Sequence, residues 1–300
     1  MRLACGLLLS AACFGQMLAP IVAGGGSSFT LTATTVGSSQ TVTINRLTLN
    51  GAQILSWGDG NSTTITSGST GTWTHVYASA GAHSINLPNA RGIVGLDLRD
   101  AQLGALNTSQ LRQSAVNYFY ATAITSSTIK SADMSAWRPA TWALYSMPAG
   151  TYSISSADMS AWRPATWDLY SMPTGTYSIS SADMAAWTGV QNLYTYSNTG
   201  GALTINTYTD FTGLVALHNL QLQNNSLAQA SVDAVLKGLW TSRASFTYAT
   251  PSLTINGTNA APSGIYQSNC PTPATGKEWA YDLVHETCAG AGHAWTVTTN

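Results

Sequence analysis

Tyrosines recur in this sequence at places where successive repeats would bring them together. Residues 142–148 recur, with one change, as residues 167–173, so Tyr145 and Tyr170 take the same place in two copies. If the leucine before each tyrosine faces inward on a strand, the period of two turns the tyrosines outward. The same alignment predicts one row of Tyr120, Tyr145, Tyr170 and Tyr194, flanked by Asp97 and Gln221, and a second row of Tyr118, Ala143, Asp168, Asn192 and Asn219.

These predicted rows have the composition of a recognition surface. Neighbouring strands lie about 4.8 Å apart, so the tyrosine rings could stack as a ladder. Exposed tyrosines with adaptable polar neighbours suit a glycan chain or a protein partner. The alternative is that the rings only brace the sheet. The candidate ligand-binding residues are Tyr120, Tyr145, Tyr170, Tyr194, Asp168, Asn192 and Gln221.

A series of acidic residues repeats at the same spacing. Asp133, Asp158 and Asp183 each follow a serine by two residues. Capping and charge at the start of a helical turn explain the serine and the acid, and calcium held between stacked copies is the alternative. Catalysis by paired carboxylates is disfavoured, because every copy carries the same single acid and no differentiated partner would separate the pKa values.

Other catalytic motifs are missing from the sequence. There is no P-loop, no dinucleotide fingerprint and no nucleophile elbow, and His285 lacks the second histidine of a zinc-protease helix. We therefore expect no enzymatic activity, no cofactor and no metal site. Cys270 and Cys288 are the two cysteines outside the N-terminal segment, so they form either a disulfide or two buried free thiols.

Composition indicates an exported protein with a nearly uncharged surface. Charged residues make up 8% of the 300 residues, against about 25% in an average soluble domain. The formal net charge of −1 gives no attraction to nucleic acid. We expect the protein to act outside the cell, at a cell surface or on the surface of a virion.

The N-terminal segment has the features of a leader, followed by a glycine-rich joint at residues 24–28. Arg2 precedes an apolar run at residues 3–14, which is too short for a membrane span of about 20 residues. We expect cleavage as a signal peptide. The alternatives are lipidation at Cys13 and an apolar arm that starts at Met17. No other stretch predicts a transmembrane span.

A repeat array must position the tyrosines. Residues 131–137 recur as residues 156–162 and, with one change, as residues 181–187, a spacing of 25 residues. Each copy predicts a short strand, a turn, an inward tyrosine and isoleucine, and one helical turn. Trp137 would pack inward from that turn, and Pro139 would stop it. Copies of this kind shield one another's apolar faces from water.

The outer copies resemble leucine-rich repeats. Residues 217–227 match the pattern LxxLxLxxNxL, and residues 93–103 match it with Ile93 at the first leucine and Ala101 in place of asparagine. The resemblance implies a solenoid of parallel strands. Beyond the last copy, the pattern predicts a helix at residues 232–240 and a final strand at residues 252–256.

Short alternating runs precede the repeats, and their period of two predicts antiparallel strands. Residues 56–60 (SWGDG), residues 75–77 (HVY) and a glycine turn at residues 80–85 resemble the signature of PKD-like immunoglobulin-fold domains. The resemblance implies a small β-sandwich, with Trp57 in its core. We expect Asp59 to bond backbone amides of its own turn.

The sequence therefore predicts a mainly β protein of four parts. They are a leader and joint at residues 1–26, a PKD-like β-sandwich at 27–90, a leucine-rich-repeat-like solenoid with parallel strands and short helical turns at 91–257, and a C-terminal cap at 258–300. Such combinations resemble bacterial surface proteins and phage virion or tail proteins. We expect a non-catalytic binding protein of adhesin type that recognises a cell-surface glycan or protein. The alternative is a structural protein that self-associates into a coat, fibre or virion decoration.

Overall fold

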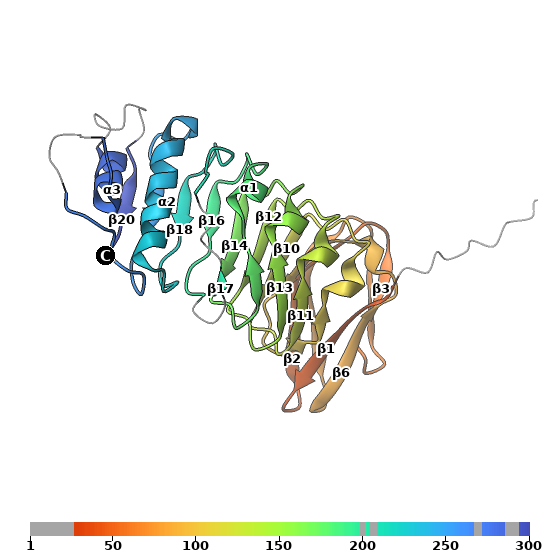
Figure 1. The fold of residues 1–300 in the computed structure, drawn as a ribbon. Coiled ribbons are helices and arrows are strands. Elements are labelled where there is room, and N and C mark those ends of the chain that lie inside the picture. Colours follow the sequence, from red (N-terminus) through yellow and green to blue (C-terminus); the bar gives the residue numbers. More distant parts are fainter. Residues whose placement is uncertain (1–26, 199–201, 204–208, 267–271, 286–293) are drawn as a thin grey trace, which may run out of the picture.

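The computed structural model describes residues 27–198, 202–203, 209–266, 272–285 and 294–300. The expected leader and both cysteines of the predicted disulfide, Cys270 and Cys288, lie outside these ranges. Within them the protein is mainly β, with antiparallel strands at the N-terminal end and parallel strands beyond it (Figure 1).

The alternating runs of the N-terminal segment form antiparallel strands, as predicted. They are β1 (Phe29–Thr35), β2 (Gln40–Leu49), β3 (Gln53–Ser56), β4 (Ser62–Ile65), β5 (Thr70–Tyr77) and β6 (Gly81–Leu87). Alternate side chains of β1 are buried, because the period of two turns them into the core. Trp57 is 1% exposed in this core, and its indole N–H donates to Thr63 Oγ1 at 2.9 Å. The predicted core position of Trp57 is confirmed.

One large sheet joins this segment to the repeats. Its strand order is β20-β19-β18-β16-β14-β12-β10-β7-β2-β5. The repeat strands are β7 (Ile93–Leu98), β10 (Tyr118–Thr122), β12 (Thr141–Tyr145), β14 (Thr166–Tyr170), β16 (Asn192–Tyr194), β18 (Asn219–Gln221), β19 (Ser252–Thr254) and β20 (Thr296–Thr298). Neighbouring repeat strands are parallel, whereas β2 joins β7 antiparallel. The sheet is therefore continuous across the domain boundary expected at residue 90.

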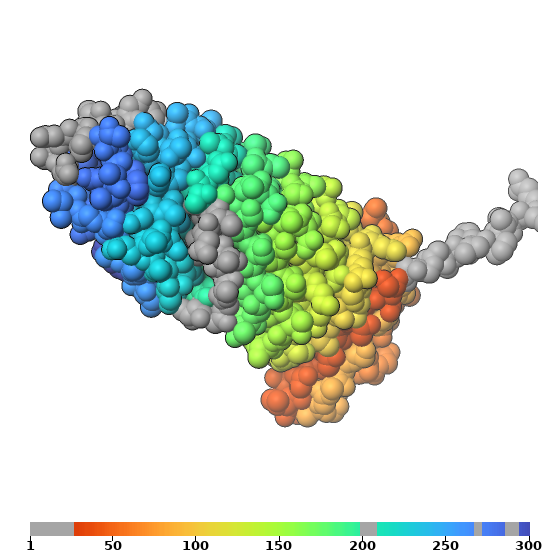
Figure 2. Space-filling view, in the orientation of Figure 1, coloured from red at the N-terminus to blue at the C-terminus, as the bar shows by residue number. Residues whose placement is uncertain are grey.

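A second parallel sheet and a series of short helices complete the repeats. The sheet has the order β17-β15-β13-β11-β9, with β9 (Leu106–Asn107), β11 (Ser127–Lys130), β13 (Thr151–Ser155), β15 (Thr176–Ser178) and β17 (Ala202–Leu203). β8 (Leu103–Gly104) pairs with β1 instead. The short helices are η1 (Ala90–Gly92), η2 (Thr108–Leu111), η3 (Ser131–Met134), η4 (Ser156–Met159) and α1 (Ser181–Met184). Figure 2 shows successive repeats as adjoining bands of colour along an elongated body.

Tryptophan side chains of successive copies stack in the interior. Trp137 and Trp162 are 0% exposed, and their rings stack at 6.4 Å with an interplanar angle of 6°. The Trp162 indole N–H donates to the carbonyl of Met134 in the preceding copy at 3.3 Å, and Trp187 makes the same bond to Met159 at 3.1 Å. Large buried aromatic side chains dominate core energetics, so each copy depends on its neighbour for stability.

The repeated serines and acids join neighbouring copies. Ser131 Oγ donates to Asp158 Oδ2 of the next copy at 2.5 Å, and Ser156 Oγ donates to Asp183 Oδ2 at 2.9 Å. The Ser131 hydroxyl also accepts the backbone N–H of Ser155 at 2.8 Å. No side-chain capping bond forms at η3 or η4. The capping role predicted for the serines is wrong, because the next copy engages their hydroxyl groups.

The C-terminal part confirms the predicted helix and strand and adds another strand. The helix is α2 (Gln229–Ser242), followed by η6 (Arg243–Ser245), and the strand is β19. A further helix, α3 (Gly276–Val284), packs against α2 and β20 (Figure 1). Because β20 pairs in parallel with β19, the C-terminal segment lengthens the large sheet by one strand.

Three asparagines tether the turns that follow the later repeat strands. Asn198, Asn225 and Asn259 each donate from Nδ2 to a backbone carbonyl of a preceding segment, at 2.6 to 2.9 Å. Their Oδ1 atoms accept backbone N–H groups from the copy before, at 2.9 to 3.1 Å. The turns are thus held by side chains as well as by the sheets. Asn225 is the asparagine of the leucine-rich-repeat pattern found in the sequence.

Candidate binding site on the strand face

The outward side of the large sheet, which we call the strand face, carries the predicted site residues in a corrected register. Its three rows are Tyr118, Thr141, Thr166, Asn192 and Asn219; Asp97, Tyr120, Ala143, Asp168, Tyr194 and Gln221; and Thr122, Tyr145, Tyr170 and Tyr196. Tyr145 pairs with Tyr170, as predicted. The predicted single row of four tyrosines is wrong, because Tyr120 and Tyr194 lie on the row of Asp168.

The difference between the predicted and the observed register can be seen at the inward-facing residues of the strands. Leu144 and Leu169 align as predicted, whereas Leu193 aligns with Trp167. One more residue separates the helical turn from the strand in this copy than in the copy before it. The predicted pairing of Leu193 with Leu169 spans 24 residues and the observed pairing with Trp167 spans 26, so the strand is shifted by two positions and Thr195 lies at a buried inward position.

Tyr145, Tyr170 and Tyr196 form the tyrosine ladder of the strand face. Tyr145 and Tyr170 stack at 4.5 Å with an angle of 7°, and Tyr170 and Tyr196 stack at 4.3 Å with an angle of 12°. Tyr120 meets Tyr145 edge-on at 5.3 Å and accepts its hydroxyl hydrogen bond at 2.8 Å. All four side chains are half-buried. Stacked rings cover each other's faces, so a ligand would meet ring edges and hydroxyl groups.

The sequence pattern did not single out Tyr196. It follows Tyr194 by two residues, so both side chains lie on the same side of the strand. The period of two identifies such a pair but cannot say which member continues a given row. Burial raises the pKa of Tyr170 and of Tyr196, and therefore both hydroxyl groups remain protonated donors at neutral pH.

A buried acid on the second row is neutralised within the chain. Asp97 is 2% exposed and accepts hydrogen bonds from Arg99 Nε at 2.8 Å and from Arg99 Nη2 at 2.7 Å. The guanidinium carbon of Arg99 lies 4.8 Å from the centre of the Tyr120 ring. Arg46 lies over the ring of Tyr118 in the same way, at 4.2 Å. This end of the strand face therefore pairs tyrosine rings with cations of the chain itself.

Asp168 lies on the same row and is also buried, at 8% exposure. Its Oδ1 atom has no hydrogen-bond partner, and none of the ion pairs among the described residues involves it. Burial raises the pKa of this carboxyl group to about 7. Burial and the Asp168 charge together raise the pKa of the neighbouring Tyr194 hydroxyl. The site thus contains an acid whose charge no side chain of the described ranges balances.

The amide side chains beyond the tyrosines bond to one another. Asn219 Nδ2 donates to Asn192 Oδ1 at 2.6 Å, and Ser252 Oγ donates to Asn219 Oδ1 at 2.8 Å. Gln221 is half-buried on the second row, and its Oε1 accepts from Gln223 Nε2 at 3.3 Å. Asn192 and Gln221 therefore lie beside the tyrosine ladder with their amide groups already partly engaged.

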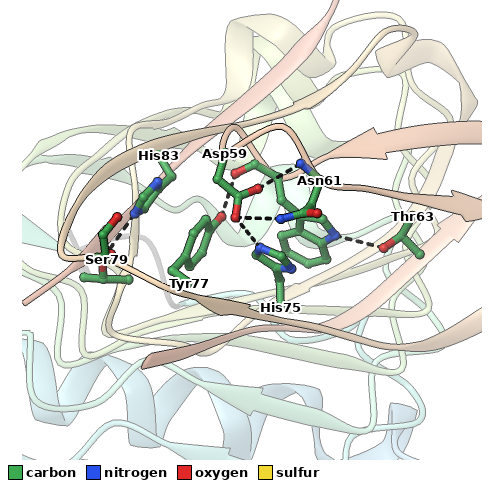
Figure 3. A network of polar contacts seen from close by, with 9 residues as sticks. Asp59, Asn61, Thr63, His75, Tyr77, Ser79 and His83 are labelled. Carbon is green, nitrogen blue, oxygen red and sulfur yellow. Dashed lines mark hydrogen bonds and ion pairs between the residues drawn. The ribbon is translucent and has the colours of Figure 1, made fainter. Parts of the chain in front are cut away.

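A separate polar and aromatic network lies in the N-terminal segment (Figure 3). Asp59 Oδ1 accepts the backbone N–H of Asn61 at 3.1 Å, and Asp59 Oδ2 lies 2.7 Å from His75 Nε2. The His75 ring stacks on Trp57 at 5.1 Å, and the Tyr77 hydroxyl donates to the Trp57 carbonyl at 2.7 Å. Although burial opposes the shift, these hydrogen bonds lower the pKa of Asp59 to about 2. The backbone bond predicted for Asp59 is confirmed.

Other features of the described residues lie away from the strand face. No group of three or more metal-ligating side chains occurs among them. One surface pocket lies near the C-terminus between Tyr266, Tyr281 and Val297, and a second lies beside α2, around Thr209 and Lys237. In the same ranges, no helix combines the length and apolar character needed to cross a bilayer.

No protein-family model matches this chain, and no curated protein and no solved structure is found to be similar to it.

Proposed function

We propose that this chain is a non-catalytic binding protein that recognises a cell-surface glycan or protein through the strand face. The observation that carries the proposal is the ladder of Tyr145, Tyr170 and Tyr196 with the buried acid Asp168 beside it. Tyrosines with polar neighbours are enriched at recognition surfaces. A surface built on paired strands also loses little conformational entropy on binding.

The strand face belongs, in this proposal, to a leucine-rich-repeat-like solenoid mounted on a PKD-like β-sandwich. The parallel pairing of the repeat strands and the bonds of Asn198, Asn225 and Asn259 support the solenoid. The buried Trp57 and the Asp59 turn support the sandwich. The low share of charged residues, 8%, favours a location outside the cell, on a cell or virion surface.

The stacked tyrosines can serve both roles considered for them, ligand binding and stabilisation of the sheet. Each inner ring contacts its neighbours at 4.3 to 4.5 Å, which stabilises the sheet. The same contacts hold neighbouring rings nearly parallel, at angles of 7° and 12°, in one row across the strands. A ligand that follows this row would exchange hydrogen bonds with the hydroxyls and pack against the ring edges.

Binding of the full chain to glycan arrays and to intact cells tests the proposal. Replacing Tyr145 and Tyr170 by phenylalanine keeps both rings and removes two hydroxyl groups. We expect affinity to fall by up to about tenfold per hydroxyl, while the loss of the Tyr145–Tyr120 hydrogen bond lowers the free energy of unfolding by only about 1 kcal/mol. Thr151→Ala and Thr176→Ala change exposed side chains of the second sheet and serve as controls. Equal binding by all variants, or no binding to any glycan or cell, would contradict the proposal.

A self-assembling coat, fibre or virion decoration is the second candidate function. The large sheet ends in the edge strands β5 and β20, and Val76 on β5 is 55% exposed. Open edge strands can pair with strands of another chain. Sedimentation velocity without ligand separates the candidates, because ordered polymers favour assembly and a monomer that binds cells favours recognition.

A further inference from the structure

Two buried acids share the second row of the strand face, and they differ in how their charge is balanced. Asp97 is held by Arg99 through two hydrogen bonds of 2.8 and 2.7 Å. Asp168 is 8% exposed, has an Oδ1 atom without a partner and takes part in no ion pair of the described residues. A buried carboxylate without a partner is strongly unfavourable. Asp168 therefore lacks the cation that Asp97 has.

The surroundings of Asp168 could accept that cation. Among the described residues, the titratable groups that interact with the Asp168 charge are three tyrosines, Tyr120, Tyr194 and Tyr196, and Tyr145 and Tyr170 lie on the adjacent row. Its row neighbour on β12 is Ala143, which has the smallest side chain of the row. Tyrosine rings attract cations through their π electrons, and Arg99 already uses the Tyr120 ring in this way at 4.8 Å.

We infer that Asp168 binds a cationic side chain of a partner protein, most favourably an arginine, which reaches the carboxyl group past the edges of the surrounding tyrosine rings. The inference rests on the proposed binding function and narrows its ligand to a basic segment of a protein. The incoming guanidinium would donate to the Asp168 carboxylate and lie against the ring of its row neighbour Tyr194, which is not part of the stacked ladder. It would thereby reproduce the arrangement of Asp97, Arg99 and Tyr120 elsewhere on the row.

Competition with a proton makes this binding depend on pH. Because burial raises the pKa of Asp168 to about 7, its carboxyl group is mostly protonated at pH 5.5 and cannot pair with a cation. The affinity for arginine should fall about 25-fold between pH 7.5 and pH 5.5. A sugar hydroxyl bound by the neutral carboxyl group would show no such loss.

Titration with two small probes tests the inference on the full chain. N-acetyl-arginine amide and N-acetyl-citrulline amide have nearly the same shape and differ in charge. With the aspartate carboxyl carbons labelled with ¹³C, the Asp168 signal should shift saturably with the arginine probe at pH 7.5. We expect binding of the citrulline probe to be at least tenfold weaker.

Two variants complete the test, followed through the tyrosine ring signals. Asp168→Asn should weaken arginine binding at least tenfold. Asp158→Asn, in the same copy but engaged by Ser131, should bind like the wild type. Equal responses to both probes, no response to either, or unchanged arginine binding by Asp168→Asn would overturn the inference. The glycan and cell assays of the phenylalanine variants do not depend on this result, so they would show separately whether the broader binding function fails.

Discussion

Replacing Asp168 by asparagine tests the electrostatics of the strand face without any ligand. Its carboxyl group has a pKa of about 7, against 3.8 for an ordinary aspartate. The folded protein therefore holds this proton more tightly than the unfolded chain does, and the resulting stability is fully present only below about pH 4. As the pH rises from about 4 to 7, Asp168 lowers the free energy of unfolding by about 4 kcal/mol in total.

Urea unfolding followed by tryptophan fluorescence measures this effect between pH 4.5 and pH 8. The difference between wild type and Asp168→Asn isolates one group, because the other titrating groups are common to both proteins. We expect the free energy of unfolding of the variant, relative to that of the wild type, to rise by about 3 kcal/mol from pH 4.5 to pH 8. Asp97→Asn is the matched control. It leaves the Arg99 guanidinium without its carboxylate, so it should destabilise the protein at pH 8 by about 1–3 kcal/mol.

A wild-type-minus-variant difference that does not change with pH would refute the reasoning. Asp168 would then titrate as it does in the unfolded chain, and it could not be buried without a partner. The reasoning would also be contradicted if Asp97→Asn and Asp168→Asn raised the free energy of unfolding equally with rising pH. The two acids differ in whether a cation balances their charge, so their replacements should have different effects.

Two further substitutions test contacts elsewhere in the chain. Ser156→Ala removes the hydrogen bonds to Asp183 and from the Ser180 N–H, so we expect the free energy of unfolding in urea to fall by about 2 kcal/mol; an unchanged value would contradict the role of this bond between copies. Because the folded state lowers the pKa of Asp59 to about 2, its contact with His75 stabilises the protein above about pH 4 and is lost as the pH falls toward 2. Asp59→Asn should lack this part of the acid transition in fluorescence, and identical transitions would contradict the assignment.

The strands and the repeats could be predicted from sequence, because both leave periodic signals. Alternation of period two located β1 to β6, and the 25-residue spacing located β12 and β14. Register was harder to predict. An inward leucine is favoured over an inward threonine, so the pattern favoured pairing Leu193 with Leu169, yet the structure buries Thr195 at that position. The sequence feature that indicated the correct pairing was the one additional residue between the helical turn and β16, compared with the preceding copy.

The candidate site was only partly predictable for a related reason. Period two places Asp168 on the outward side of β14, where a polar side chain is expected to be solvated. Its burial arises from the tyrosine rings around it, and their positions depend on the corrected register. The hydrogen bonds of Asp158 and Asp183 could not be predicted either. The local sequence suggests that these residues stabilise the start of a helical turn, whereas their serine donors lie 27 residues earlier in the chain.

The bonds between copies also determine how this protein could change its length over evolution. Ser131 donates a hydrogen bond to Asp158, 27 residues later in the sequence, and the Trp162 indole donates to Met134, 28 residues earlier. Since the central copies that begin at Ser131 and Ser156 present the same donors and acceptors, a duplicated central copy would find its partners on both sides. Recombination could thus add or delete whole copies, and each one would alter the reach of the tyrosine-bearing surface by about 4.8 Å while leaving both ends of the molecule intact.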